Sequence, residues 1–124
     1  THNQPIIITR SSNNFGPYQY PEKIIPLFVT NLLDGKKVPL YGNGENSRDW
    51  IYVIDNCDAI QHVIEKGTIG EIYNIGGGNN VKNIELTKQV VDSRLKLGKQ
   101  NANLCRHLHC ELSLGVLRMI YYNI

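Results

Sequence analysis

The sequence has few cysteines, no long apolar run and no large excess of either charge. Its three cysteines, Cys57, Cys105 and Cys110, are too few and too unevenly spread for a disulfide framework, which favours a reducing, cytoplasmic setting. No apolar run approaches the ~20 residues that span a bilayer. The net charge of +2 gives no argument for nucleic acid or an anionic membrane as a partner.

The 124 residues are enough for one small domain with a modest core. An apolar content of 41% lies in the ordinary globular range and argues against disorder along the whole length. The chain opens at Thr1 inside a structural pattern, without an initiator methionine or a signal peptide. We therefore expect a fragment or a processed chain.

Short β-branched and aromatic runs alternate with segments whose apolar residues recur at helical spacing, which is typical of an α/β unit. Residues 11–20 are rich in turn formers and are predicted as a loop. Pro26 fits only in the first turn of its helix, Gly35 is a plausible C-terminal cap, and Asp55 and Asn83 are expected N-caps. We predict extended segments at residues 5–10, 38–41, 50–53 and 71–75, and helices at 21–34, 55–67 and 83–98.

Two adjacent amides follow the first predicted strand. Residues 5–10 form an apolar run typical of a buried parallel strand that is covered on both faces. Asn13 and Asn14 follow its carboxyl end, where open α/β sheets bind ligands. An amide both donates and accepts hydrogen bonds, which suits a sugar hydroxyl or a carboxamide. The alternative is a turn in which these side chains bond to the local backbone.

A second group of candidate residues lies in the loop from Tyr41 to Trp50, which contains two glycines. Arg48 could make a two-pronged contact with a phosphate. Tyr41 could stack on a base or a sugar. The alternative is a surface ion pair between Arg48 and Asp49 on a hairpin loop.

Two further patterns give weaker evidence for a binding site. Gly76–Gly78 could approach a diphosphate through backbone N–H groups, although these residues do not form the Gly-x-Gly-x-x-Gly pattern of a first βα turn. Residues 105–110 bring together two cysteines and two histidines, but their spacing is too compact for paired zinc knuckles. We predict no metal site.

Three segments together resemble the dTDP-glucose 4,6-dehydratases, which are extended short-chain dehydrogenases/reductases. Thr9–Pro26, with its Asn-Asn-Phe-Gly-Pro-Tyr-Gln-Tyr-Pro-Glu-Lys run, is similar to the segment after the catalytic helix of that family. Tyr41–Val53 and Gly70–Gly78 resemble the next two family blocks, in the same order and spacing. The resemblance covers about residues 1–92.

The resemblance implies an NAD-dependent enzyme whose cofactor is bound mainly by an N-terminal Rossmann domain. The cofactor would take hydride from C4 of the hexose, water would leave across C5 and C6, and hydride would return to C6. The implied substrate is a nucleotide sugar, a dTDP-hexose, and full-length members are expected to be homodimers. The resemblance puts Asn14 on the nicotinamide side. It gives contacts with the nucleotide sugar to Asn13, Lys23, Ile24, Pro39, Tyr41, Arg48 and Asn74.

The implied fold is α/β: the last strand of a Rossmann-type parallel sheet, then the small α/β substrate-binding domain of an extended short-chain dehydrogenase/reductase. Residues 1–20 would end the Rossmann portion and form the substrate and cofactor loop, and residues 21–98 would bind the nucleotide sugar. Residues 99–124 form a divergent tail in place of the family's Arg-Pro-Gly-His-Asp-like loop. A frameshift is one hypothesis for that change.

The glycine-rich cofactor loop, the Tyr-x-x-x-Lys pair and the acidic elimination residues of the family do not occur in the sequence. We therefore expect the isolated chain to be catalytically inactive. Two alternatives stay open: another NAD-dependent nucleotide-sugar epimerase or decarboxylase of the superfamily, and a non-catalytic nucleotide-sugar-binding remnant. The run Asn13–Lys23 favours the dehydratase, because the superfamily pattern is looser there.

Overall fold

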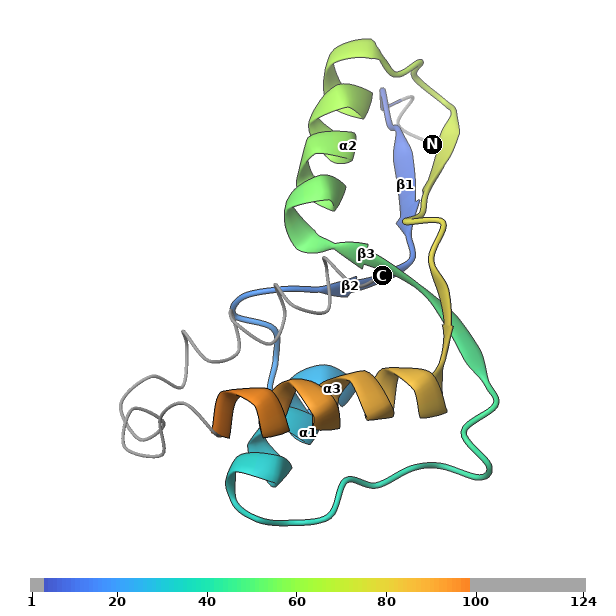
Figure 1. Cartoon of the computed structure of the whole chain (residues 1–124). Coiled ribbons are helices and arrows are strands. Elements are labelled where there is room, and N and C mark those ends of the chain that lie inside the picture. Colours follow the sequence, from blue (N-terminus) through green and yellow to red (C-terminus); the bar gives the residue numbers. More distant parts are fainter. Residues whose placement is uncertain (1–3, 99–124) are drawn as a thin grey trace.

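The computed structural model describes residues 4–98, which form an α/β fold (Figure 1). The tail predicted at residues 99–124, with its cysteine and histidine cluster, lies outside the described residues. Within the described range, no helix is both long enough and apolar enough to cross a bilayer. The elements in chain order are β1 (Ile8–Ser11), β2 (Asn13–Phe15), α1 (Ile24–Leu33), β3 (Ser47–Tyr52), α2 (Val53–Lys66), β4 (Ile72–Ile75), β5 (Asn80–Lys82) and α3 (Asn83–Gly98).

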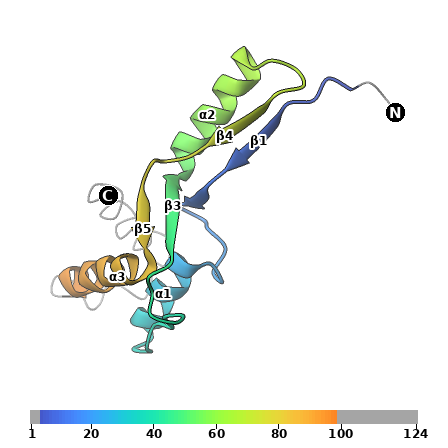
Figure 2. The same ribbon diagram turned by 90° about the vertical axis from the view of Figure 1, so that its right-hand side faces the viewer.

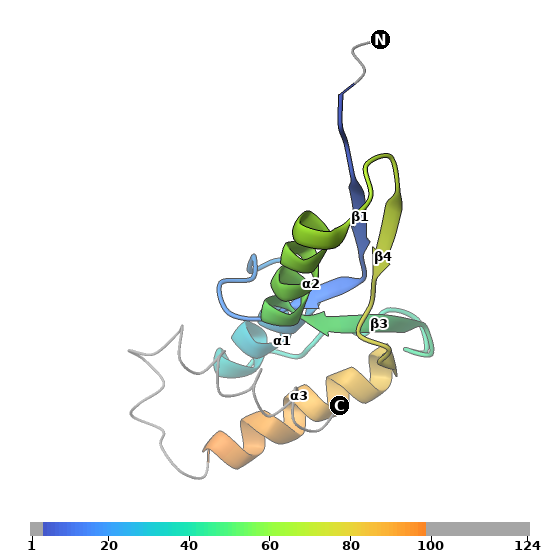
Figure 3. The same cartoon turned by 90° about the horizontal axis from the view of Figure 1, so that it is seen from above.

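The strands form two small sheets. β1 and β4 pair in parallel, with Ile8 opposite Ile72. The second sheet has the order β2-β3-β5, in which β2 is parallel to β3 and β5 is antiparallel to it. Figure 2 shows α2 beside the β1–β4 pair, with α1 and α3 near the other end of β3. Seen from above, β2 and β3 run across the direction of β1 and β4 (Figure 3).

The apolar core lies where α1 and α3 pack on the three-stranded sheet. Phe15 of β2 contacts Trp50 of β3 edge to face, with ring centroids 6.4 Å apart. Phe28 of α1 and Leu86 of α3 are fully buried in this cluster. The core consists of Phe15, Ile25, Phe28, Val29, Trp50, Val81, Leu86 and Val90.

Helix α1 confirms two predictions and corrects one boundary. Pro26 lies in the first turn, where its missing N–H has no intrahelical acceptor to lose. Gly35 follows the C-cap at φ +71°, and its N–H donates to Leu32 O while the N–H of Lys36 donates to Asn31 O. These two bonds form a Schellman motif. The helix begins at Ile24 rather than near residue 21, because residues 21–23 form a turn.

Several other elements differ from the prediction, in part because strands form by pairing between distant segments. The predicted loop at 11–20 contains β2, which pairs with β3, and the three-residue strand β5 was not predicted. Residues 38–41 form no strand. Helix α2 begins at Val53 with Tyr52 as its N-cap, so Asp55 lies in the first turn and not at the cap.

Strand β1 is parallel, as predicted, but it is not buried on both faces. Ile6 is 54% exposed and Ile8 is 47% exposed. Among the described residues, α2 is the helix that lies beside this sheet, while α1 and α3 pack elsewhere (Figure 2). The prediction of a covered strand was therefore wrong for residues 4–98, because no second layer of these residues covers it.

Candidate functional site

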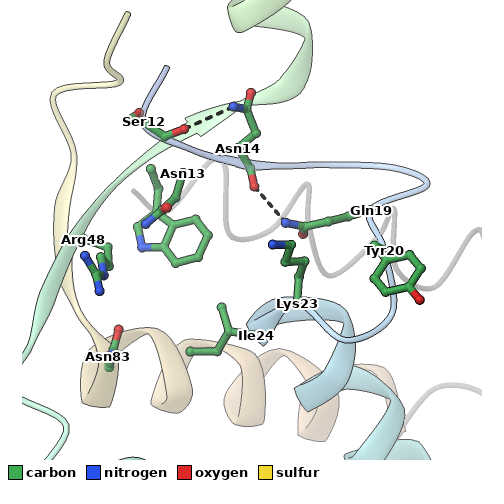
Figure 4. A pocket seen from close by; sticks show the side chains of 10 residues that line it. Ser12, Asn13, Asn14, Gln19, Tyr20, Lys23, Ile24, Arg48 and Asn83 are labelled. Carbon is green, nitrogen blue, oxygen red and sulfur yellow. Dashed lines mark hydrogen bonds between the residues drawn. The ribbon is translucent and has the colours of Figure 1, made fainter. Parts of the chain in front are cut away.

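A cavity of about 490 Å³ opens between β2, β3 and the N-terminal ends of α1 and α3 (Figure 4). Strand β2 supplies Asn13 and Asn14 from its start, and Lys23 and Ile24 lie at the N-terminus of α1. Arg48 points in from β3. The full lining is Ser12, Asn13, Asn14, Gln19, Tyr20, Lys23, Ile24, Arg48, Trp50 and Asn83.

Two cations border this cavity without partners of opposite charge. Within residues 4–98, neither Arg48 nor Lys23 forms an ion pair; the pairs found there join Lys36 to Asp34 and Lys82 to Glu45. The alternative of an ion pair between Arg48 and Asp49 is therefore wrong. Two free cations beside a helix N-terminus favour an anionic ligand such as a phosphate.

The two predicted amides differ in their bonding. The Nδ2 of Asn14 donates to Ser12 O at 3.1 Å, and Gln19 Nε2 donates to the backbone oxygen of Asn14 at 2.8 Å (Figure 4). Asn14 therefore makes the local backbone bond that was the alternative interpretation. Asn13 is exposed, and its side-chain amide bonds to no described residue, so this amide is available to a ligand.

Asp49 holds the glycine-rich loop against β3. Its carboxylate accepts from Gly77 N at 2.9 Å and from Asn79 N at 2.6 Å. A Cβ placed on Gly77 would collide with the backbone oxygen of Trp50, so the close approach requires glycine. Because the Gly77 N–H is already bonded, this loop is anchored within the fold, which weakens its interpretation as a diphosphate cradle.

These contacts also set the charge state of Asp49. Burial raises the pKa of this carboxyl, but the nearby Ser12 hydroxyl and the backbone N–H groups of Gly77, Asn79 and Gly78 lower it by more, so the net pKa lies below its ordinary value. The Ser12 hydroxyl falls short of a well-formed bond, so the two backbone N–H groups at Gly77 and Asn79 are the firmer contacts. Asp49 is thus a carboxylate anion whose hydrogen-bond donors are the backbone N–H groups of Gly77 and Asn79.

Three predicted residues lie away from the cavity lining. Tyr41 is 82% exposed in the loop before β3. Pro39 is exposed in the same segment, and Asn74 is exposed on β4, where it pairs with Arg10. Their roles toward a ligand stay predictions.

Five lining residues were missed. Trp50 is two positions after Arg48 on one strand, so strand periodicity placed it on the same face as Arg48. Gln19 and Tyr20 belong to the run that carried the family resemblance. Ser12 and Asn83 offered no signal beyond their positions at the ends of elements. Among the described residues, no group of three His, Cys, Asp or Glu side chains is placed to hold a metal ion.

The fold and the cavity define an α/β protein with a site suited to a polar, anionic ligand. The model of the NAD dependent epimerase/dehydratase family matches residues 1–76, and the chain belongs to that family. It is 54% identical over 93 residues to a dTDP-glucose 4,6-dehydratase of Streptomyces niveus, which covers 75% of this chain and 28% of that relative. It is 50% identical, over 75% of this chain and 30% of the relative, to the low-salt glycan biosynthesis protein Agl12 of Haloferax volcanii.

The chain is also similar to solved structures of dehydratases and epimerases. A dTDP-glucose 4,6-dehydratase from Streptomyces venezuelae, solved with NAD bound, superposes with a TM-score of 0.73 at 55% identity, over 75% of this chain and 29% of that one. A UDP-glucuronic acid 4-epimerase from Bacillus cereus, solved in complex with UDP-glucuronic acid and NAD, superposes with a TM-score of 0.68 at 27% identity, over 79% of this chain and 31% of that one. The chain thus spans less than a third of the length of these relatives.

Proposed function

We propose that this chain is the nucleotide-sugar-binding part of an NAD-dependent dTDP-glucose 4,6-dehydratase. The whole enzyme would convert dTDP-glucose to dTDP-4-keto-6-deoxyglucose by eliminating water, with hydride taken up and returned by the cofactor. The observation that carries this proposal is one cavity bordered by two unpaired cations, Arg48 and Lys23, and by the free amide of Asn13.

Four side chains at the cavity each suit one part of such a ligand. The guanidinium of Arg48 matches two oxygens of a diphosphate, and the ammonium of Lys23 adds a second positive charge. Ile24 offers an apolar surface to a base or a sugar ring (Figure 4). Asn13 can donate to and accept from a sugar hydroxyl.

The degree of similarity favours the dehydratase over the epimerases of the same family. Relatives and solved structures named dTDP-glucose 4,6-dehydratase are 42–55% identical, whereas the UDP-glucuronic acid 4-epimerase structures are 27–28% identical. We infer from this difference that the base is thymine and that the sugar is a hexose.

Asn14 is the residue here that fits a contact with NAD. Its Oδ1 is buried beside the cavity and bonds to no described residue, so it could accept an N–H such as that of a carboxamide. When bound, NAD would supply the hydride acceptor. Asn14 would orient the carboxamide, and most contacts with NAD would come from elsewhere in the enzyme.

Further expectations follow from the family. The chain alone should be inactive, because the sequence carries no Tyr-x-x-x-Lys pair to assist hydride transfer. We infer that the full-length enzyme is a homodimer of the cytoplasm. Pro39, Tyr41 and Asn74 would approach the nucleotide only if other parts of the enzyme bring it near them.

Calorimetric titration of the chain with dTDP tests the proposal. We expect binding, and we expect Arg48→Ala to weaken it about 10- to 100-fold, the worth of one hydrogen bond to a charged group. Arg10→Ala is the matched control, because Arg10 lies on β1 outside the cavity lining. It removes the same charge and should leave the affinity for dTDP unchanged.

Two results would contradict the proposal. One is the absence of heat with dTDP on a chain that shows a cooperative melting transition. The other is equal weakening by Arg48→Ala and Arg10→Ala, which would indicate attraction by net charge alone. Tighter binding of UDP than of dTDP would instead favour the epimerase alternative.

A further inference from the structure

Trp50 is the single tryptophan of the chain, and its indole N–H has no hydrogen-bond partner among the described residues. The side chain is 5% exposed and lines the cavity. An indole N–H can only donate, and a buried one usually has an acceptor. An unpaired donor in the wall of a cavity therefore points to an acceptor that a ligand brings.

The indole lies on the same face of β3 as the cationic side chain of Arg48. Side chains two residues apart in a strand point to the same side, and both residues line the cavity. Asn13 pairs opposite Trp50 across the β2–β3 ladder and borders the same space. Figure 4 shows Asn13 and Arg48 beside the same open region.

The neighbouring rings restrict how Trp50 can move. Phe15 meets the indole edge to face, at an interplanar angle of 76°. Phe15 also contacts Tyr52 at 5.6 Å between ring centroids. A donor held this firmly loses little conformational freedom when it bonds to a ligand, so it can contribute to affinity and to orientation.

We propose that the indole N–H of Trp50 donates a hydrogen bond to a phosphate oxygen of the bound nucleotide diphosphate. This inference rests on the proposed function. A phosphate oxygen is favoured over a sugar hydroxyl because the indole stands beside Arg48, one of two unpaired cations at the cavity. In the free chain the indole N–H is shielded from solvent, so the ligand must displace neighbouring side chains to reach it.

The single tryptophan allows a direct measurement on the full 124-residue chain. Labelled with nitrogen-15, the chain gives one indole N–H resonance. We expect dTDP to move this resonance downfield and to slow its exchange with solvent, in step with the bound fraction from calorimetry. Inorganic pyrophosphate should move it in the same direction.

Trp50→Phe removes the donor and keeps an aromatic ring for Phe15 to pack against. We expect the dissociation constant for dTDP to rise about tenfold, within the range for a bond to a charged acceptor. Tyr73→Phe is the matched control. It removes one polar atom from an aromatic residue outside the cavity lining and should leave the affinity unchanged.

The outcomes separate this inference from the proposed function. If dTDP binds and Arg48→Ala weakens it while the indole resonance stays still, the role of Trp50 is overturned and the proposed function stands. A resonance that moves with dTDP-glucose but not with dTDP or pyrophosphate would overturn the phosphate assignment. If dTDP does not bind at all, the proposed function fails, and this inference fails with it. Should Trp50→Phe not fold, the resonance of the unaltered chain decides.

Discussion

The two ends of the molecule use their apolar side chains differently. The packed half, made of β2, β3, β5, α1 and α3, contains the whole core cluster. The open half, made of β1, β4 and α2, contributes one buried apolar side chain, Ile75, among the described residues. Several of its other isoleucines are exposed, with Ile54 at 53% and Ile64 at 75%.

This difference places the candidate binding cavity mainly in the packed half of the molecule. The cavity is formed mainly by the packed half, where rigid neighbours hold Trp50 and Ile24 in place. In the open half, β1 and β4 form a two-stranded parallel sheet, and parallel sheets usually have cover on both faces. Among the described residues, the open half therefore leaves apolar side chains exposed, whereas the packed half has its own core.

The largest expected effect is the loss of a core side chain from the packed half. Phe28 is 2% exposed, and Phe28→Ala should lower the free energy of unfolding by about 3–5 kcal/mol. Ile64→Ala, in the open half, should lower it by less than about 0.5 kcal/mol. Urea unfolding followed by circular dichroism measures both, and similar losses for the two variants would contradict the division into halves.

The sequence predicted the parts of the fold that depend on local signals. The helical spacing of Ile24, Leu27 and Phe28 and the glycine at position 35 indicated α1 to within a few residues. Strand β2 was missed because Asn13 and Asn14 have low β propensity, and its pairing depends on β3, distant in the chain. Strand β5 has only one apolar residue, Val81, so no alternation could reveal it.

The candidate site was predicted unevenly for the same reason. Asn13, Asn14, Lys23, Ile24 and Arg48 border one cavity, but their roles toward a ligand stay predictions. Arg48 was predicted from the chemistry of its guanidinium. Its guanidinium is free of an ion pair because Asp49 accepts hydrogen bonds from a distant loop instead, and no local sequence pattern specified the position of that loop. Trp50 was read as part of a strand, because a sequence does not show whether a buried donor has an acceptor.

A smaller effect is expected from Asp49, which joins β3 to the loop that leads into β5. The carboxylate accepts two backbone N–H bonds at the edge of the packed half, and Asp49→Asn weakens both. We expect a loss of about 1–2 kcal/mol near neutral pH, at the low end for charged hydrogen bonds because the group is partly exposed. Thermal melting of the chain and the variant measures this loss.

The pH dependence gives a sharper test of the same contact. Burial raises the pKa of Asp49, but its hydrogen bonds lower it more, to below the ordinary value of 3.8. A lowered pKa means that the stabilisation is fully present above pH 3.8 and is lost as the pH falls through the lower, folded-state pKa. The difference between chain and variant should therefore shrink only in acid. Asp58→Asn is the control, because Asp58 is exposed on α2. A stability difference between the chain and Asp49→Asn that stays constant into acid would contradict the role of the charge.

The smallest effect on stability is expected on the surface of the open half. Ile64→Ser replaces an exposed side chain and should change the free energy of unfolding by no more than about 0.5 kcal/mol, and Ile72→Ser, at a half-exposed strand position, should lower it by about 1 kcal/mol. The same changes should reduce self-association of the chain, measured by light scattering against concentration, because exposed apolar patches promote contact between molecules. Ile25→Ser is the control in the packed half and should prevent folding, since Ile25 is 1% exposed. If Ile72→Ser instead cost as much as a core substitution, β4 would be packed in solution and the open half would have a core of its own.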